Sequence, residues 1–572
     1  MLEVLANPRV GWALALVLTT LIVRLLHKLH FYRSLVKGLP GPPHSYLWGS
    51  LRSMGEVIAS QPKRAAPQTY GLLIKEHYGL GDYFYVDPWP FGDPILMIFD
   101  ADLMNQLTVK QSMPKHPEVE KFMRAVGGPG NMVSSEGAEW KKWRSAFNPG
   151  FAANHLMSLV PLIVDDVLVF NEIMTKHAKN DDLFRMERAA TSLTVDIIGK
   201  VVLDFDLASQ KGPNELVDTF MKQVQWQRIG AQFAPIELID GPIRIPMQWY
   251  LTWKMDRYIS KRLNERFSSR ERRGKSRATI DLALEAYLKE VKGTTGDISE
   301  VKTIDPEFKR AAINNIKTFI FAGHDTTSST IAYAFYYLSK NPEMLEKIRK
   351  EHNDVFGPDR ESVPDQLKQD PRLLNKLEYT LAVIREVLRL QPPASTVRLG
   401  QKGFFLRDPA TGEQLPTEHM MLWPVRYDQF NYSHSIKLTR QQIGAGLHRT
   451  EKYWTEPHVF KPERHLTHSS DGSANYNSRE AWVAFSRGNR NCIGQELAMI
   501  ETKVILAMTI RTFDFHPAFH ELDKLKGDGS GYPSDMSGVQ EQFGDEAYQI
   551  QLGKAMPAHP ERRYSTVGSE LT

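Results

Sequence analysis

The longest apolar stretch near the start of the chain runs from Val10 to Leu26 and is broken only by Arg24. As a helix it would span roughly 25 Å, slightly less than the ~27 Å core of a thin cellular bilayer. Basic residues cluster at and beyond its end and favour a cytosolic location for the rest of the chain: Arg24, Lys28, Arg33 and Lys37. A cleaved signal peptide is the alternative, but no small-x-small cleavage site follows and the basic flank lies on the wrong side. We predict a single membrane anchor in residues 1–30.

A basic and proline-rich segment, residues 31–44, follows this anchor and contains Leu39-Pro-Gly-Pro-Pro43. Proline fixes φ and favours an extended path, so the segment predicts a stiff hinge. No internal repeat and no long low-complexity linker interrupt residues 45–572. We expect this remainder to be one large domain.

Short alternating segments predict strands, and longer patterns with a 3.6-residue period predict helices. Tyr83–Val86 and Ile95–Phe99 lie between Gly, Asp and Pro breakers and predict a β-hairpin. Helical patterns begin at Gly137, ending before Pro149, and cover Asn375–Leu390. The pattern predicts a mainly α fold with small β-sheets.

Two further segments are less easily classified. Residues 220–253 are rich in aromatics and prolines, which suit a membrane interface, the roof of an apolar pocket or ordinary core packing. The basic segment Lys261–Arg277 contains Gly and Ser and predicts an exposed loop.

One long helix is predicted from Asp305, an N-cap residue followed by Pro306, to Lys340. Its length would be roughly 52 Å, enough to cross a whole domain. Apolar residues fall on every side of its middle, as in a buried helix. The same middle contains Ala322-Gly-His-Asp-Thr-Thr327, and glycine, a charge and two hydroxyls are costly in a buried helix. Stability alone does not explain this segment.

Composition narrows the classes of function. The formal net charge of +4 is too small to indicate a nucleic-acid binder. The chain has one cysteine, Cys492, which excludes an intramolecular disulfide and a multi-cysteine zinc site. A buried structural cysteine is the ordinary interpretation. The residues around Cys492 favour a different interpretation.

Cys492 precedes an apolar-periodic segment, so we expect it at a helix N-terminus, where free N–H groups stabilise a thiolate. Gly488 and Gly494 on either side permit close approach of a large flat group, and Arg490 brings a positive charge. A thiolate beneath a planar cofactor is one known way of ligating haem iron.

The stretch Phe485–Gly494 resembles the haem-binding signature of the cytochrome P-450 family, Phe-x-x-Gly-x-Arg-x-Cys-x-Gly, and matches every fixed position. The resemblance implies haem b, with Cys492 as the axial ligand of the iron. Phe485, Gly488, Arg490 and Gly494 would then contact the cofactor. It also implies the P-450 fold over the predicted domain.

The middle of the long helix resembles the family's Ala-Gly-x-Asp/Glu-Thr-Thr/Ser. By this resemblance Gly323 lets the helix open locally to admit dioxygen and water, Thr326 hydrogen-bonds at the oxygen site, and Asp325 relays protons from solvent. The alternative for Thr326 is a hydrogen bond to a carbonyl one turn earlier. His324 is not needed by the motif and receives no role.

Several other residues match family positions. Trp140 and Arg144, four apart, resemble Trp-x-x-x-Arg and would donate to a haem propionate, although a buried Trp and a solvated Arg on an amphipathic helix is the alternative. By resemblance Arg398 also reaches a propionate, and so does His448.

Glu386 and Arg389 resemble the family's Glu-x-x-Arg. Arg464 would complete a structural network with them; a surface ion pair is the alternative.

Two segments depart from the family pattern, residues 421–437 and the Gly/Ser/Asp-rich residues 521–545. No complete Gly-x-Gly-x-x-Gly is present, so electrons are expected from a separate protein. The resemblance to microsomal members names NADPH–cytochrome reductase for this and the endoplasmic reticulum membrane for location. Lys141 and Lys142 could meet an acidic reductase, but a solvated face is the simpler account.

The resemblance implies a haem-thiolate monooxygenase that inserts one oxygen atom from O2 into a lipophilic substrate. The layout is similar to fungal natural-product oxygenases acting on secondary metabolites such as terpenoids or polyketides. Two alternatives are a haem-thiolate isomerase or dehydratase that uses no O2, and a non-catalytic membrane protein that binds haem or lipid.

Overall fold

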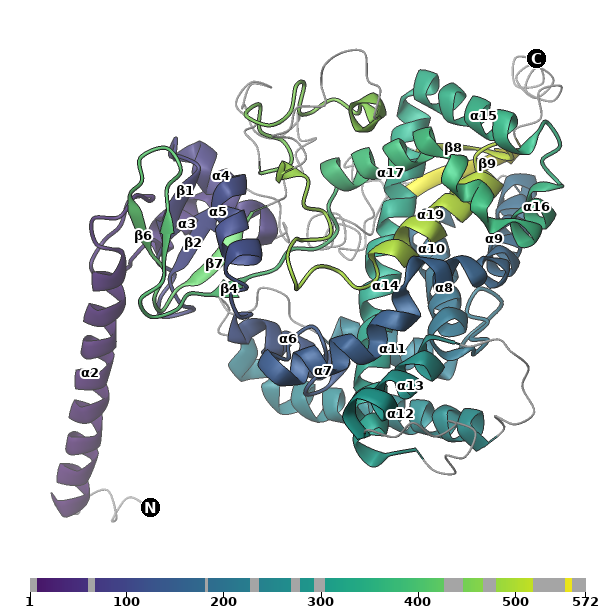
Figure 1. Ribbon diagram of the computed structural model, residues 1–572. Coiled ribbons are helices and arrows are strands. Elements are labelled where there is room, and N and C mark those ends of the chain that lie inside the picture. The colour runs from purple at the N-terminus through teal and green to yellow at the C-terminus, as the bar shows by residue number, and fades with distance from the viewer. Residues whose placement is uncertain are drawn as a thin grey trace.

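The computed structural model describes residues 8–59, 67–180, 184–226, 236–268, 278–292, 304–425, 446–466, 480–517 and 551–557. Within these residues helices dominate and the strands form three small sheets, which confirms the expected fold class. Figure 1 shows a large helical lobe, a smaller lobe around a sheet, and one helix that projects away from the smaller lobe.

The smaller lobe contains the first helices and the four-stranded sheet. Its strand order is β1-β2-β7-β4, with β2 and β7 parallel and the other pairs antiparallel. The predicted hairpin is therefore confirmed. The elements of this lobe are α2 Pro8–Val36, α3 Leu51–Ala59, α4 Pro67–His77, β1 Tyr83–Val86, β2 Ile95–Ile98, α5 Ala101–Asn105, the π-helix η1 Gln106–Lys110, β4 Arg398–Leu399, β5 Phe405–Arg407, β6 Gln414–Pro416 and β7 Met421–Pro424.

The helical lobe is built around α14, which spans Pro306–Lys340 as the sequence predicts, with Asp305 capping its N-terminus. The helices before it are α6 Pro117–Gly127, α7 Gly137–Phe147, η2 Asn148–Phe151, α8 Ala153–Ser158, α9 Val160–Asn180, α10 Met186–Ile198, the π-helix η3 Gly199–Leu203, α11 Glu215–Gln225, α12 Ile236–Ser268 and α13 Thr279–Lys292. Those after it are α15 Pro342–Phe356, α16 Val363–Gln369, η7 Pro371–Lys376, α17 Glu378–Leu390, η8 Pro462–His465 and α19 Gln495–Thr509. A third sheet, in the order β3-β9-β8, comprises β3 Phe184–Arg185, β8 Phe513–Pro517 and β9 Gln551–Pro557.

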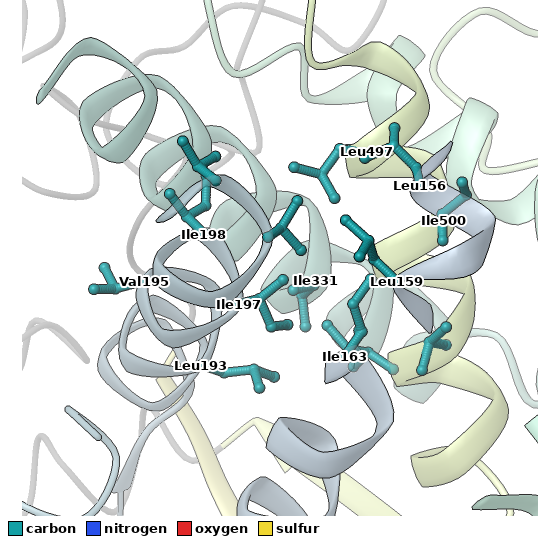
Figure 2. Packing of buried hydrophobic residues seen from close by; sticks show 14 of the residues in the cluster. Leu156, Leu159, Ile163, Leu193, Val195, Ile197, Ile198, Ile331, Leu497 and Ile500 are labelled. Atoms are coloured by element: carbon teal, nitrogen blue, oxygen red, sulfur yellow. The ribbon is translucent and has the colours of Figure 1, made fainter. Parts of the chain in front are cut away.

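One continuous apolar core holds the helical lobe together. Figure 2 shows side chains of α8, α9, α10, α14 and α19 interdigitating, among them Ile163, Ile197, Ile331 and Leu497. Each is almost completely buried. Burial of one such side chain contributes about 1.5–3 kcal/mol, so this core fixes where α14 and α19 meet.

The structure corrects three boundaries. Helix α2 continues to Val36, so the first part of the expected hinge is helical. Helix α17 begins at Glu378 because the preceding turn is a 3₁₀ helix ending at Lys376. Residues 261–268 of the expected basic loop belong to α12, while residues 269–277 lie outside the described residues.

Helix α12 also decides among the interpretations of the aromatic-rich residues 220–253. Trp249, Tyr250 and Trp253 are exposed, so ordinary core packing is wrong for these three. The two departures from the family pattern are only partly described: residues 421–424 form β7, whereas residues 426–437 and 521–545 lie outside the described residues.

Candidate active site

The cysteine loop reaches α19 through a tight hydrogen-bonded turn. The Cys492 N–H donates to the Phe485 carbonyl at 2.9 Å, and the Asn491 N–H to that of Gly488 at 3.1 Å. Gly488 has φ +74°, and a Cβ there would overlap the Thr108 carbonyl oxygen, so only glycine fits. Cys492 precedes Gln495, the first residue of α19, and does not itself belong to the helix. The expected position at the helix N-terminus is correct to within one turn.

The environment of the Cys492 thiol combines exposure with poor solvation. The side chain is exposed, yet burial raises the pKa of its thiol. These two observations agree if the sulfur faces a hollow that the surrounding protein shields from bulk water. The Gly494 and Gln495 N–H groups and the Arg144 charge act in the opposite direction and lower the pKa. A bound metal ion would complete the deprotonation of such a thiol.

Cationic side chains surround the cysteine loop. Arg144 donates through Nη1 to the Asn491 carbonyl at 2.9 Å and through Nη2 to the Asn491 side chain at 3.0 Å. The Arg490 guanidinium lies 4.5 Å from the centre of the Trp140 ring and pairs with Glu136 at 3.1 Å. The alternative of a solvated Arg144 is therefore wrong, because this arginine holds the residue next to Cys492.

Arg398 gives the clearest evidence that this cluster of cations binds an anion. It is 1% exposed, and its Nε has no hydrogen-bond partner. Burial and the nearby Arg490 charge lower its pKa to about 10, although the charge of the Glu136 carboxylate acts in the opposite direction. A buried cation beside a second cation is costly unless a carboxylate compensates it. A haem, which carries two propionates, fits this donor set.

Sequence reasoning missed two residues of the same region. Lys115 is the bridge partner of Arg398 and therefore lies on the same face of that strand pair; its Nζ donates to Thr396 Oγ1 at 2.6 Å. Glu136 accepts from the Lys115 N–H at 2.7 Å and from Arg490, so it links the two segments. Only a predicted pairing between residues near 115 and near 398 could have revealed them.

The middle of α14 is accessible although the turns on either side of it, residues 314–320 and 327–335, are buried. Ala322 is exposed and Thr326, one turn later on the same face, is partly exposed, between fully buried neighbours such as Ile320 and Ser328. Accessible residues inside a buried helix indicate a hollow beside it. The Thr326 hydroxyl donates to the Ala322 carbonyl at 2.8 Å, which is the alternative raised by the sequence.

Helix α14 does not open at Gly323, since it is continuous from Pro306 to Lys340. Gly323 serves close packing in this structure: a Cβ there would overlap the Cδ1 methyl of Ile198 on α10. The expected opening is therefore absent from this conformation, and the glycine has a separate reason to be small.

His324 and Asp325 face different surroundings. Asp325 is partly exposed, which suits contact with solvent. His324 is buried, its Nδ1 lies 2.6 Å from the Ile320 carbonyl, and burial lowers its pKa to about 4. The imidazole is therefore neutral near pH 7 and bonded within its own helix.

Glu386, Arg389 and Arg464 form the expected network, with all three side chains buried. Arg389 donates to both oxygens of Glu386 at 2.8 Å, and Arg464 Nε donates to the same carboxylate at 3.1 Å. His465 adds a contact at 2.9 Å that the sequence analysis did not include. The surface ion-pair alternative is wrong, and the network fixes the segments around residues 448–466.

Two expected roles are not supported by the geometry. The His448 Nε2 accepts from the Val483 N–H at 2.9 Å, and its Nδ1 lies 3.0 Å from the Arg389 carbonyl. Both ring nitrogens are thus engaged by main-chain groups, so His448 has no N–H directed at a propionate and braces the cysteine loop. Lys142, expected on a solvated face, is 24% exposed and pairs with Glu307 at 2.5 Å.

Comparisons with known proteins agree with this geometry. The family description "Cytochrome P450" matches residues 75–401 and 443–534. A solved structure described as a cytochrome P450, CYP102L1, superposes with a TM-score of 0.64 at 19% identity, over 85% of this chain and 98% of that one. This likeness confirms the P-450 fold.

Curated relatives extend the agreement to activity. The chain is 36% identical to "Cytochrome P450 monooxygenase polC" of Polytolypa hystricis, over 97% of this chain and 95% of the relative. It is 34% identical to "Cytochrome P450 monooxygenase acrF" of Aspergillus aculeatus, over 88% of this chain and 97% of the relative. With the cysteine loop and the fold, these matches show that the chain belongs to the cytochrome P450 family of haem-thiolate monooxygenases.

Proposed function

We propose that this monooxygenase inserts one oxygen atom from O2 into a lipophilic fungal secondary metabolite such as a terpenoid or polyketide, using electrons from a separate NADPH–cytochrome reductase. The similarity to fungal monooxygenases supports the substrate class. The observation that carries the proposal is the accessible face of Ala322 and Thr326 inside the otherwise buried α14.

In the proposed site the cofactor is haem b. Cys492 would ligate its iron, while Arg144, Arg398, Arg490 and Trp140 would hold its propionates. The haem would supply the redox chemistry that activates O2, which thiolate ligation promotes. The Arg398 Nε and the cationic surroundings fit two carboxylates. A Cβ on Gly494 would lie 3.9 Å from the Cys492 sulfur, so glycine keeps this space beside the sulfur empty.

We assign proton delivery to Asp325 and Thr326. The Asp325 carboxylate is partly exposed and can exchange protons with water. The Thr326 hydroxyl now donates to the Ala322 carbonyl, so its hydrogen must rotate away from that oxygen before it can be passed on. Asp325 and Thr326, adjacent on α14 and about one turn after Gly323, would thus connect solvent to the oxygen site.

Replacing Thr326 with alanine tests this assignment. We expect product formed per NADPH to fall by about tenfold or more while hydrogen peroxide rises, since general acids contribute ~10²–10⁴ in rate. The matched control is Thr330→Ala, which removes a hydroxyl bonded in the same way one turn later, to the Thr326 carbonyl at 2.8 Å. An unchanged product yield in Thr326→Ala would contradict the relay.

We also propose that the chain is a single-pass protein of the endoplasmic reticulum with a cytosolic catalytic domain. Residues 12–36 of α2 make it the one helix among the described residues that is long and apolar enough to cross a membrane. Arg24, Lys28 and Lys37 are exposed toward its C-terminal side, whereas Arg33 is buried and does not add to the basic flank.

The substrate can be found by screening lipophilic compounds for a shift of the Soret band. Turnover of a hit should require both reductase and O2. Turnover without reductant would favour an isomerase or dehydratase, and the absence of substrate-dependent O2 consumption for any hit would favour a binding protein.

A further inference from the structure

A short apolar loop stands beside the end of the anchor helix. We call residues Ser45–Gly49 the aromatic loop. Its ends are closed by two main-chain hydrogen bonds, Ser45 N–H to Gly49 at 3.0 Å and Gly49 N–H to Ser45 at 2.8 Å. Three large apolar side chains at its tip are exposed to similar extents: Tyr46 60%, Leu47 62% and Trp48 59%. A closed loop that presents three such side chains to water suggests a contact surface.

Helix α2 itself holds this loop in place. Arg33, 2% exposed, donates through Nε to the Tyr46 carbonyl at 3.0 Å and through Nη2 to the Leu47 carbonyl at 3.0 Å. Its Nη1 pairs with the buried Asp87 at 2.5 Å. Gly49, at φ +57°, has no room for a Cβ, which would lie 2.6 Å from Arg33 Nη1. The loop, the helix and the sheet lobe are therefore one packed unit.

The loop lies at a definite height along the helix. The Tyr46 hydroxyl is 3.3 Å from His30 Nδ1. His30 lies roughly 6 Å beyond Leu26, the end of the apolar stretch, at 1.5 Å per residue. The headgroup layer on each side of a bilayer is about 5–8 Å thick. If α2 spans the membrane, the tip of the loop is level with the headgroups, where Trp and Tyr are enriched.

We propose that the aromatic loop enters the headgroup layer of the bilayer that α2 spans, as a second contact with the membrane. This inference rests on the proposed anchoring by α2. The loop is continuous with that anchor through Arg33, and its amphipathic rings suit the interface. Two contacts held by one buried arginine would set the tilt of the catalytic domain, which a single helix on a loose hinge would not.

Tryptophan quenching by brominated lipids tests the proposal. Full-length, haem-loaded protein is placed in phosphatidylcholine nanodiscs whose acyl chains are brominated near the headgroup, near the terminal methyl, or not at all. The emission difference between wild type and Trp48→Phe isolates the Trp48 signal. We expect bromine near the headgroup to remove most of this signal and bromine near the terminal methyl to remove much less.

The same subtraction with Trp454→Phe supplies the control, because Trp454 is buried at 4% exposure and its signal should be equal in all discs. A Trp48 signal of equal intensity in all discs overturns the proposal while leaving the anchor intact. A Trp48 signal that instead changes with protein concentration assigns the loop to a second copy of the chain and also overturns it. Release of the protein from membranes by alkaline carbonate contradicts the anchor, and the loop contact with it.

Discussion

At the scale of single residues, Gly323 shows that a motif position can have two reasons for its identity. The family motif explains glycine by the oxygen site, but the structure adds a packing reason, since a Cβ would overlap Ile198 Cδ1. Ile198 is 3% exposed within the core shown in Figure 2 and cannot move freely. The two reasons can be separated by substitution.

Gly323→Ala should destabilise the protein by about 1–3 kcal/mol, the usual cost of overpacking, despite the ~1 kcal/mol that alanine gains in a helix. Ile198→Val alone should cost about 0.5–1.5 kcal/mol. In the double variant the removed Cδ1 makes room for the new methyl, so its cost should be less than the sum. Urea unfolding of the four proteins measures this coupling, and strict additivity would contradict the packing account.

Which residues could be predicted depends on how local their signal is. Cys492, Trp140 and Arg144 were found because their motifs are contiguous or lie one helical turn apart. Glu136 and Lys115 were missed because their roles depend on contacts with residues 354 or 281 positions away. The engagement of His448 by main-chain groups is also long-range, so resemblance alone assigned it a role that the geometry does not support.

At the scale of elements, two buried carboxyl groups have pKa values shifted in opposite directions. Glu386 on α17 is paired with Arg389 and Arg464; burial alone would raise its pKa, but Arg389 and His465 hold it below the ordinary value of 4.5. Glu501 on α19 is also buried, but its Oε1 has no hydrogen-bond partner, and burial raises its pKa well above 4.5. The charge on Asp166 raises it further. The folded environment therefore favours the charged form of the first group and the neutral form of the second.

Glu386→Gln should lower the free energy of unfolding by about 3–5 kcal/mol, because it leaves Arg389 and Arg464 buried without their carboxylate. Since the folded pKa is depressed, the stabilisation by Glu386 exists above pH 4.5 and is lost as the pH falls. Wild type should therefore lose its advantage over the variant in acid. The control is Glu378→Gln, an exposed position on the same helix that should stay within ~0.5 kcal/mol.

Glu501→Gln should have the opposite effect and raise the free energy of unfolding at neutral and alkaline pH. The folded state binds a proton that the unfolded state loses above pH 4.5, so wild-type stability should decrease as the pH rises, by up to about 1.4 kcal/mol per pH unit from this group. Glutamine stays neutral and removes this slope, so the variant should be as stable as wild type near pH 5 and more stable near pH 8. Thermal unfolding across that range, with exposed Glu496→Gln as control, measures the difference. Parallel curves for wild type and Glu501→Gln would contradict a protonated Glu501.

Elements with strong local signals were predicted well. The cap at Asp305 and the apolar pattern gave α14 its observed limits. Helix α12 was not recognised because Pro242 and Pro246 lie inside it and each removes a main-chain hydrogen bond. The extension of α2 to Val36 was missed because its last turns are held by contacts with the sheet lobe, such as Arg33 with Asp87.

At the scale of the whole molecule, the join between α2 and the smaller lobe determines how the catalytic domain sits on a membrane. Figure 1 shows α2 leaving the protein as a straight rod from the lobe that contains β1 and β2. Leu29, Arg33 and Val36 lie on one face of its last turns and are all buried. The join is therefore packed where the sequence suggested a hinge.

The orientation of the haem plane relative to the membrane should depend on Arg33. In oriented bilayers the linear dichroism of the Soret band reports this angle, and the wild-type protein should give a strong signal. Arg33→Met leaves Asp87 without its guanidinium and frees the loop that Arg33 holds, so the packed join should loosen and most of the dichroism should disappear. Lys28→Met removes the same charge from an exposed position of α2 and should leave the signal unchanged. Equal dichroism in Arg33→Met and wild type would mean that other contacts, such as the stacking of Tyr32 on Trp89 at 5.9 Å, are sufficient to hold the join.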